Sequence, residues 1–199
     1  MATADLPPTS EKRHRVPAAE RRDALVEAAI EEFAHAGLHA TPVDRIARRV
    51  GVAQPYVFSL FPTKRDLFIA AVERGFDRVM TLFRDAVAPL EPGTPSSEIL
   101  AVIGDSYLQM LAVDRNCLML QLQAYASCED EVIAEHVRDA YARLGALIME
   151  LSGCEQQKLD EFLAFGMYLS VNAALGSERL EAIITAKRAA MDAERLSGC

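Results

Sequence analysis

The stretch that most constrains the fold is residues 41–68, where two short helical patterns flank a glycine and lead directly into a third. Thr41 is a good N-cap residue and Pro42 suits the first position of a helix, so a helix is predicted to begin there. Gly51 follows about two turns later, where a left-handed residue would end a helix, and Pro55 favours the start of the next one. Two short helices joined by a tight turn form the helix-turn-helix arrangement that many DNA-binding proteins place in the major groove.

Three residues in this stretch suit two helices that cross at close range. Such a crossing needs a small residue where the backbones approach, a residue with positive φ in the turn and an apolar residue on the inner face of the second helix. Ala47, Gly51 and Val57 supply these in that order. Asp44 lies three residues after Thr41 and is expected to complete a capping box with it.

The second and third helices of the stretch carry signals of their own. Val57, Phe58 and Phe61 fall at helical spacing and are predicted to face inward. Thr63 and Asp66 form another capping-box pattern, so a long helix is predicted to start immediately after the threonine and to run to about residue 88.

Charge is distributed unevenly along the chain. The formal net charge of −8 by itself disfavours a nucleic-acid partner. However, residues 1–74 contain 11 Lys and Arg against 10 Asp and Glu, whereas residues 75–199 contain 10 against 19. Within residues 41–65 the only acidic residue is Asp44, and the basic ones are Arg45, Arg48, Arg49, Lys64 and Arg65. The basic segment therefore coincides with the predicted helix pair, as expected for a DNA-binding surface, with an ordinary solvated helix face as the alternative.

These residues resemble the TetR-type transcriptional regulators from about Arg15 to Phe76. The resemblance rests on a first helix with Ala and Phe that ends in Gly37, on the pairs Ile46-Ala47 and Gly51-Val52, and on the sequence FPTKRDLF at residues 61–68. Gln54 and Pro55 are similar to the start of the recognition helix in the repressor that gives the family its name. The resemblance implies a three-helix DNA-binding head on a larger helical domain that binds a small effector and forms a homodimer.

The sequence departs from the family pattern at four positions. Pro42 stands where a second Thr is usual, Ala53 where a Ser often caps, and Leu60 where His is frequent. Phe58 stands where the family most often has Tyr, so the tyrosine hydroxyl that contacts phosphate in the family has no counterpart here.

The predicted DNA contacts divide into base and phosphate contacts. Gln54 is the best candidate for a bidentate contact to adenine, and Pro55 or Tyr56 could touch a thymine methyl group. Lys64 lies in the first turn of the long helix, where a cation is unfavourable to the helix dipole, so a bound phosphate is expected to compensate. The full predicted set is Thr41, Arg45, Arg48, Gln54, Pro55, Tyr56, Phe58, Ser59 and Lys64. The expected partner is a pseudo-palindromic double-stranded operator that a dimer contacts at sites about 34 to 36 Å apart.

The remaining sequence predicts an all-α protein. Residues 1–16, with the basic run at 12–15, are expected to form a flexible arm that either reaches a minor groove or is a solvated tail. Residues 17–75 are assigned to the DNA-binding domain and 76–199 to the effector-binding and dimerisation domain. Helices are predicted at 17–36, 97–112, 115–127, 130–152, 156–175 and 177–195, with a Pro-, Gly- and Ser-rich linker at 89–97.

Two sets of residues in the second domain are predicted to bind partners. An effector pocket is expected from Met80, Phe83, Leu108, Gln109, Met119, Gln121, Tyr125, Phe162 and Asn172, although core packing alone would explain any one of them. Residues 162–175 are apolar nearly all round and must be covered on more than one side. The family resemblance implies a dimer interface there, with Phe165, Gly166, Tyr168, Leu169 and Leu180 as candidates and Gly166, Ser170 and Ala174 as a row of small residues.

Other functional classes lack support in the sequence. No nucleophile motif or HExxH pattern indicates an enzyme, and no cofactor or metal site is expected, since Gly37 separates His35 from His39. The acidic second part disfavours an architectural DNA-binding protein. No apolar run reaches the about 18 to 20 residues of a membrane span and no secretory segment is present, so a cytoplasmic protein is expected. The four cysteines are expected to be reduced, with redox sensing as the alternative, and Cys117 and Cys154 are expected in the core.

Overall fold

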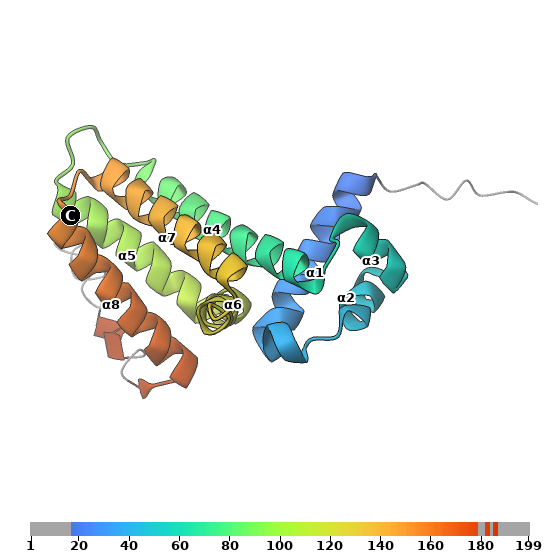
Figure 1. Cartoon of the computed structure of the whole chain (residues 1–199). Helices are drawn as coiled ribbons and strands as arrows, with labels where there is room; N and C mark the ends of the chain where they lie inside the picture. The colour runs from blue at the N-terminus through green and yellow to red at the C-terminus, as the bar shows by residue number, and fades with distance from the viewer. Residues whose placement is uncertain (1–16, 179–181, 184, 187–199) are drawn as a thin grey trace, which may run out of the picture.

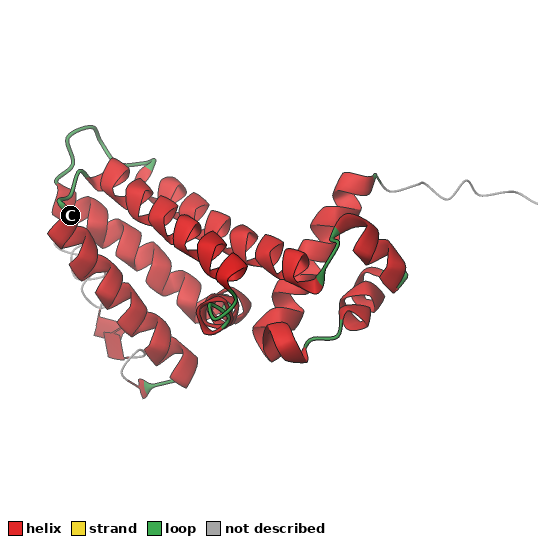
Figure 2. Cartoon of the chain, viewed as in Figure 1, coloured by secondary structure: helices red, strands yellow, loops and turns green. Residues whose placement is uncertain are grey.

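The computed structural model describes residues 17–178, 182–183 and 185–186. In this part of the chain every regular element is a helix (Figures 1 and 2). The helices are α1 (Ala18–Ala40), α2 (Val43–Val50), α3 (Gln54–Leu60), α4 (Lys64–Val87), α5 (Ser96–Val113), α6 (Arg115–Ala126), α7 (Glu131–Ser152) and α8 (Gln156–Leu175). The prediction of an all-α fold is confirmed. Of the segments predicted from sequence, the arm at 1–16 and most of the helix at 177–195 lie outside the described residues.

The helices form two groups joined by α4. The group α1 to α3, called the head below, lies at one end of the molecule, and α4 runs from it into a bundle with α5, α7 and α8 (Figure 1). The C-terminal part of α1 also packs against α6, so one apolar core extends from Leu25 in the head to Ala173 in α8. The contact between α1 and α6 was not predicted from the sequence, because no local pattern reports it.

The turn between α2 and α3 forms as its residues predict. Gly51 has φ 75° and ψ 34°, and its N–H donates to the carbonyls of Ala47 and Arg48. The N–H of Val52 also donates to the carbonyl of Ala47, at 3.0 Å, which closes the end of α2. Ala47 and Val57 are both buried where the two helices cross.

The start of α2 differs from the prediction. Pro42, not Thr41, is its N-cap residue, and no side chain caps the helix. The reason lies in α1, which Gly37 interrupts with φ 70° and ψ 178° before the helix resumes as far as Ala40. The interruption leaves the carbonyl of Gly37 in need of a donor, and the buried Thr41 hydroxyl lies 2.7 Å from it and 3.1 Å from the carbonyl of Glu32. The predicted capping box between Thr41 and Asp44 is therefore wrong.

The long helix α4 forms as predicted. The Thr63 hydroxyl accepts from the Asp66 N–H while the Asp66 carboxylate accepts from the Thr63 N–H, so this capping box is complete. The predicted apolar stripe of α4 is buried: Leu67, Ala71, Phe76, Met80 and Phe83. Among the described residues, no helix combines the length and the apolar character needed to cross a membrane.

Candidate nucleic-acid interface and ligand cavity

One face of α3 packs against the core of the head, and the opposite face is exposed to solvent. Val57 and Phe61, one turn apart, are almost fully buried. Phe58 was predicted to face inward, but 39% of it is exposed, because α3 has only seven residues and contacts the core along one narrow stripe. Gln54 and Pro55 are exposed as well.

Two more members of the predicted DNA-contact set lie on α3. Ser59 is exposed, and its hydroxyl donates to the carbonyl of Tyr56 at 2.7 Å. The Tyr56 ring is half-buried, and the guanidinium of Arg21 lies 5.9 Å from its centroid. The guanidinium of Arg22 lies 4.7 Å from the ring centroid of Phe61. These two arginines of α1 thus help to hold α3 in position. The sequence analysis did not identify them, although they are adjacent near the start of a helix.

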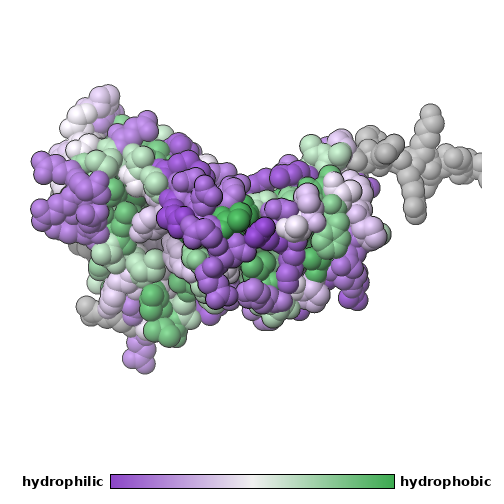
Figure 3. Space-filling model, viewed as in Figure 1, coloured by the Kyte–Doolittle hydropathy of each residue, from purple (hydrophilic) through white to green (hydrophobic). Residues whose placement is uncertain are grey.

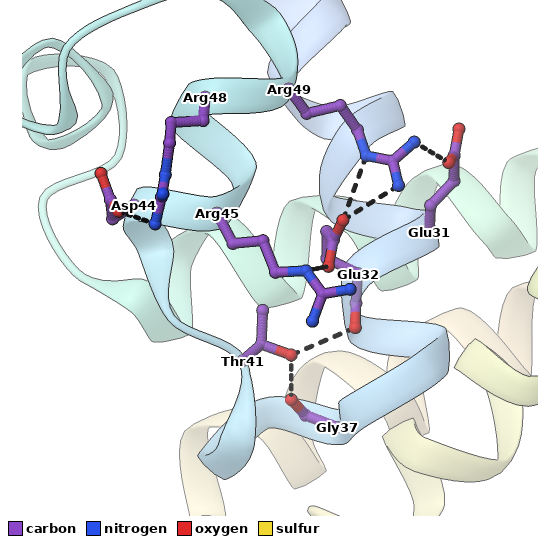
Figure 4. Close-up of polar contacts among 8 residues, drawn as sticks. All are labelled: Glu31, Glu32, Gly37, Thr41, Asp44, Arg45, Arg48 and Arg49. Carbon is purple, nitrogen blue, oxygen red and sulfur yellow. Dashed lines mark hydrogen bonds and ion pairs between the residues drawn. The ribbon is translucent and has the colours of Figure 1, made fainter.

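The arginines of α2 are held by carboxylates of the head. Glu32 on α1 is buried, and its carboxylate accepts from the Arg45 guanidinium at 2.7 Å and from Arg49 at 3.0 and 3.1 Å (Figure 4). Arg49 also pairs with Glu31. A buried carboxylate that two arginines share fixes the position of α2 against α1. Arg45, predicted to contact phosphate, is thus first of all a structural residue in this chain.

The other two predicted phosphate contacts differ in how free they are. Within the described part of the chain, Arg48 pairs only with Asp44 one turn earlier on its own helix, and 74% of its side chain is exposed. The Lys64 ammonium donates to the carbonyls of His39 and Thr41, at 3.0 and 3.2 Å. These carbonyl groups compensate the charge of Lys64 within the chain, and its contact with a phosphate stays a prediction.

Three contacts hold α7 and α6 against α4 and the head. Arg65 donates twice to Asp130, the N-cap residue of α7, and these bonds hold the pKa of the Asp130 carboxyl below its usual value. His136 on α7 lies 2.9 Å from Glu73 on α4. Gln123 on α6 packs directly on the backbone of Gly37.

A cavity of about 460 Å³ lies inside the bundle and is bordered by α4, α5, α6, α7 and α8. Most of its wall is apolar, formed by Val72, Phe76, Val79, Phe83, Leu100, Leu108, Leu120, Leu144, Ile148, Phe162, Leu163 and Leu169 among others. Four residues of the predicted pocket line it: Phe83, Leu108, Gln121 and Phe162.

The other predicted pocket residues lie elsewhere. Met80 is buried in the core, Gln109 is exposed, and Met119 is half-buried outside the cavity. The Tyr125 hydroxyl accepts from the Gln121 amide and its ring packs edge-to-face on Tyr141, while Asn172 bonds to the Tyr168 carbonyl and to Ser177. Conversely, Phe165, Gly166 and Leu169, which were predicted to form a dimer interface, line the cavity.

One group of polar side chains faces the cavity. The Tyr107 hydroxyl lies 3.0 Å from the Gln121 side-chain oxygen and 2.8 Å from the Ser170 hydroxyl. Burial raises the pKa of Tyr107. Sequence reasoning missed Tyr107 as a cavity residue and placed Ser170 on an interface, because the pattern of a helix that is apolar on all sides does not show which side faces the cavity.

The exposed face of α8 carries large apolar side chains. Phe165, Tyr168, Val171 and Leu175 are exposed, Leu175 to 75%, and the rings of Phe165 and Tyr168 stack with centroids 6.0 Å apart. Figure 3 shows a hydrophobic patch over this helix at the lower left of the molecule. Ser170 is buried, so the predicted row of small residues does not all face outward, and Leu180 lies outside the described residues.

The cysteines and histidines of the described residues bring no set of metal ligands together. No group of three or more His, Cys, Asp or Glu side chains in this part of the chain could hold a metal ion. Cys117 and Cys154 are buried, as predicted, and burial raises the pKa of Cys117 to about 11.

Comparison with known proteins agrees with the geometry of the head. The profile described as "Bacterial regulatory proteins, tetR family" matches residues 25–71, from the middle of α1 into α4. Residues 25–71 of this chain are therefore similar to the DNA-binding region of the TetR-family transcriptional regulators.

The curated relatives match only part of the chain. The chain is 34% identical over 96 residues to the HTH-type transcriptional activator FasR of Mycolicibacterium smegmatis. The matched segment covers 42% of this chain and 44% of FasR. The matched part thus spans less than half the length of that relative.

Solved structures share the fold of nearly the whole chain. A putative transcriptional regulator from Saccharomonospora viridis in complex with choline matches with a TM-score of 0.69 and 18% identity, over 84% of this chain and 94% of that one. FadR from Bacillus subtilis in complex with stearoyl-CoA matches with a TM-score of 0.66 and 18% identity, over 82% and 94%. At such identity the match establishes the TetR-like fold alone.

Proposed function

We propose that this chain is a homodimeric transcriptional repressor that reads a pseudo-palindromic DNA operator with α3 and leaves it when a small molecule fills the cavity. The observation that carries the proposal is the position of α4, which starts beside the head at Lys64 and borders the cavity at Phe83. A ligand in the cavity therefore touches the helix that sets the position of α3. Two proteins of similar fold hold choline or stearoyl-CoA, which supports a ligand for this cavity.

Base reading is assigned to Gln54. It is exposed in the first turn of α3 and can make a bidentate contact to adenine. Gln54→Ala should cost about 1 to 3 kcal/mol and relax the preference at one base pair per half-site. The operator is first selected from a random DNA pool, and affinity is then measured by fluorescence anisotropy on single-base variants. Gln157→Ala, an exposed glutamine of α8, is the matched control. Equal weakening on all sequences would show that Gln54 does not read a base.

Phosphate contact is assigned to Arg48, the most exposed arginine of α2. Arg48→Ala should weaken binding to every sequence and reduce the slope of log affinity against log salt by about one per half-site. Arg84→Ala, which removes an exposed arginine in the last turn of α4, at the end of that helix away from the head, should leave the slope unchanged. Phe58→Tyr should tighten operator binding, because the ring is exposed and the variant adds the phosphate-contacting hydroxyl that TetR-type regulators usually carry at this position.

Dimerisation is assigned to the exposed apolar face of α8. Association of two copies would cover Phe165, Tyr168, Val171 and Leu175, which are otherwise in water. Replacing Leu175 with Glu should shift sedimentation toward the monomer and weaken operator binding, because two heads must sit about 34 to 36 Å apart. An unchanged sedimentation coefficient would place the interface elsewhere.

Release by the effector obeys linkage. If a ligand weakens operator binding, the operator must weaken ligand binding by the same factor, commonly about 5 to 150-fold. Calorimetric titration of the ligand into free and operator-bound protein measures this factor, and equal affinities would rule out the switch. Deleting the gene should raise expression of a reporter behind the selected operator, whereas a fall would show activation, the role that the name of FasR states for that relative.

A further inference from the structure

The charged side chains around the cavity lie at its opening and neutralise each other. Among the described lining residues the only charged ones are Lys158 and Glu161, which are exposed and lie 2.9 Å apart. The opening lies between α5 and α8, where Ser97, Ala101 and Phe165 are the other exposed lining residues.

Inside the opening, the part of the wall formed by described residues offers no counter-ion. The ionisable groups there are phenols and a thiol, and burial raises the pKa of Tyr107, Tyr141 and Cys117, so that all three are neutral at neutral pH. A carboxylate or an ammonium group that entered the cavity would lose its hydration without gaining a partner charge.

The polar groups of the wall gather at one place. A chain of hydrogen bonds runs from Tyr125 through Gln121 and Tyr107 to Ser170 and ends on the Gly166 carbonyl, with distances of 2.8 to 3.0 Å. The hydroxyl groups of Tyr107 and Ser170 take part in three contacts: Tyr107 with Gln121, Tyr107 with Ser170, and Ser170 with the Gly166 carbonyl. The two hydroxyl groups have only two protons to donate to these three contacts. One oxygen of the chain is therefore left to accept from a further donor, and a hydroxyl group supplies both a donor and an acceptor.

We propose that the cavity binds an uncharged amphiphile, whose hydroxyl end joins the hydrogen bonds of Tyr107, Gln121 and Ser170 and whose aliphatic or aromatic body lies against the apolar wall. The proposal rests on the proposed function, because it names the ligand class of the same cavity. It assigns to this chain neither a fatty-acid anion nor a quaternary ammonium ion. The cavity volume of about 460 Å³ suits a single small molecule of this kind.

Four probes of equal chain length separate charge from hydrogen bonding. They are 1-octanol, octanoate, octyltrimethylammonium and methyl octyl ether, each titrated calorimetrically into the full chain at neutral pH. Octanol should bind at least about tenfold more tightly than either ion, because each ion is desolvated without a counter-ion. It should bind about 2 to 10-fold more tightly than the ether, which lacks the donor. Binding of either ion as tight as that of octanol would overturn the proposal.

Variants locate the hydroxyl site. Tyr107→Phe should remove most of the preference for octanol over the ether, while Thr81→Val, which removes an exposed hydroxyl of α4 that does not line the cavity, should leave it unchanged. Ser170→Ala provides a second test should Tyr107→Phe fail to fold. Equal preferences in all three variants and the parent would overturn the assignment of these residues.

The proposed function fails in a different measurement. Operator binding without any ligand, followed by anisotropy, tests DNA recognition alone. If octanol binds as expected but leaves operator affinity unchanged, the ligand class stands and the proposed switch fails. If the operator binds but octanol and the two ions bind equally, DNA recognition stands and the ligand class is overturned.

Discussion

Replacing Gly37 with alanine tests how the head is seated on the bundle. Gly37 has φ 70° and ψ 178°, a region of the backbone map that side-chain-bearing residues almost never occupy, at a cost of about 1 to 3 kcal/mol. An added Cβ would also lie 2.6 Å from the Gln123 side-chain oxygen. That oxygen is the end of a flexible, half-buried side chain, which can move aside for about 1 kcal/mol or less. Backbone strain should therefore dominate, and the total cost should be about 1 to 4 kcal/mol.

The assay is urea unfolding followed by circular dichroism, at one protein concentration for all variants. Gly37→Ala should lower the midpoint without changing the slope. In that background Gln123→Ala should recover less than about 1 kcal/mol, since it relieves the contact and not the strain. Gly153→Ala is the control for a glycine with φ 65° and ψ 19° that has no atom near its added Cβ, and should cost about 1 to 2 kcal/mol. Full recovery by Gln123→Ala would refute the reasoning, because the steric contact would then dominate.

Three further results are expected. Glu32→Ala should lower the free energy of unfolding in urea by about 1 to 3 kcal/mol, less than the loss of a fully buried ion pair, because Arg45 and Arg49 are half-exposed. Glu31→Ala, which removes a more exposed carboxylate, should lower it by less than about 1 kcal/mol. Arg65 holds the pKa of Asp130 below its ordinary value of about 3.9, so this carboxylate stabilises the fold above that pH and the benefit is lost as the pH falls. Asp130→Asn should thus flatten the acid side of a plot of stability against pH, and an unchanged plot would contradict the role of the pair. Burial raises the pKa of Cys117 to about 11, so the stability that its neutral thiol contributes is present below about pH 8.5 and is lost as the pH rises through 11. At pH 8 iodoacetamide should therefore leave Cys117 unmodified in the native protein, which mass spectrometry can show.

Features that depend on a few neighbouring residues could be predicted from the sequence. The capping box of Thr63 and Asp66 and the left-handed Gly51 require only the backbone within one turn, so both formed as predicted. Helix bounds in the bundle followed from periodicity and from the prolines and glycines between the helices. The same local logic failed at Thr41, because a carbonyl four residues earlier, released by the interruption at Gly37, competes for its hydroxyl.

Pairing between helices was decided only by the tertiary structure. The sequence shows that α2 is basic, but not that Glu32 of α1 engages Arg45 and Arg49 and leaves Arg48 the most exposed. It likewise could not place the Lys64 ammonium on the carbonyls at the end of α1. Helical periodicity reports which face of a helix is buried, whereas the partner of a side chain depends on the register and rotation of a second helix.

The candidate cavity follows the same division. Its apolar character was predictable from the composition of the bundle helices, and four of the nine residues predicted for it line it. Only Gln121 of its polar end was predicted, because Tyr107, Gln121 and Ser170 come from α5, α6 and α8 and their grouping is not visible in the sequence. They meet only where these helices pack together, and burial there obliges each polar group to bond to the others.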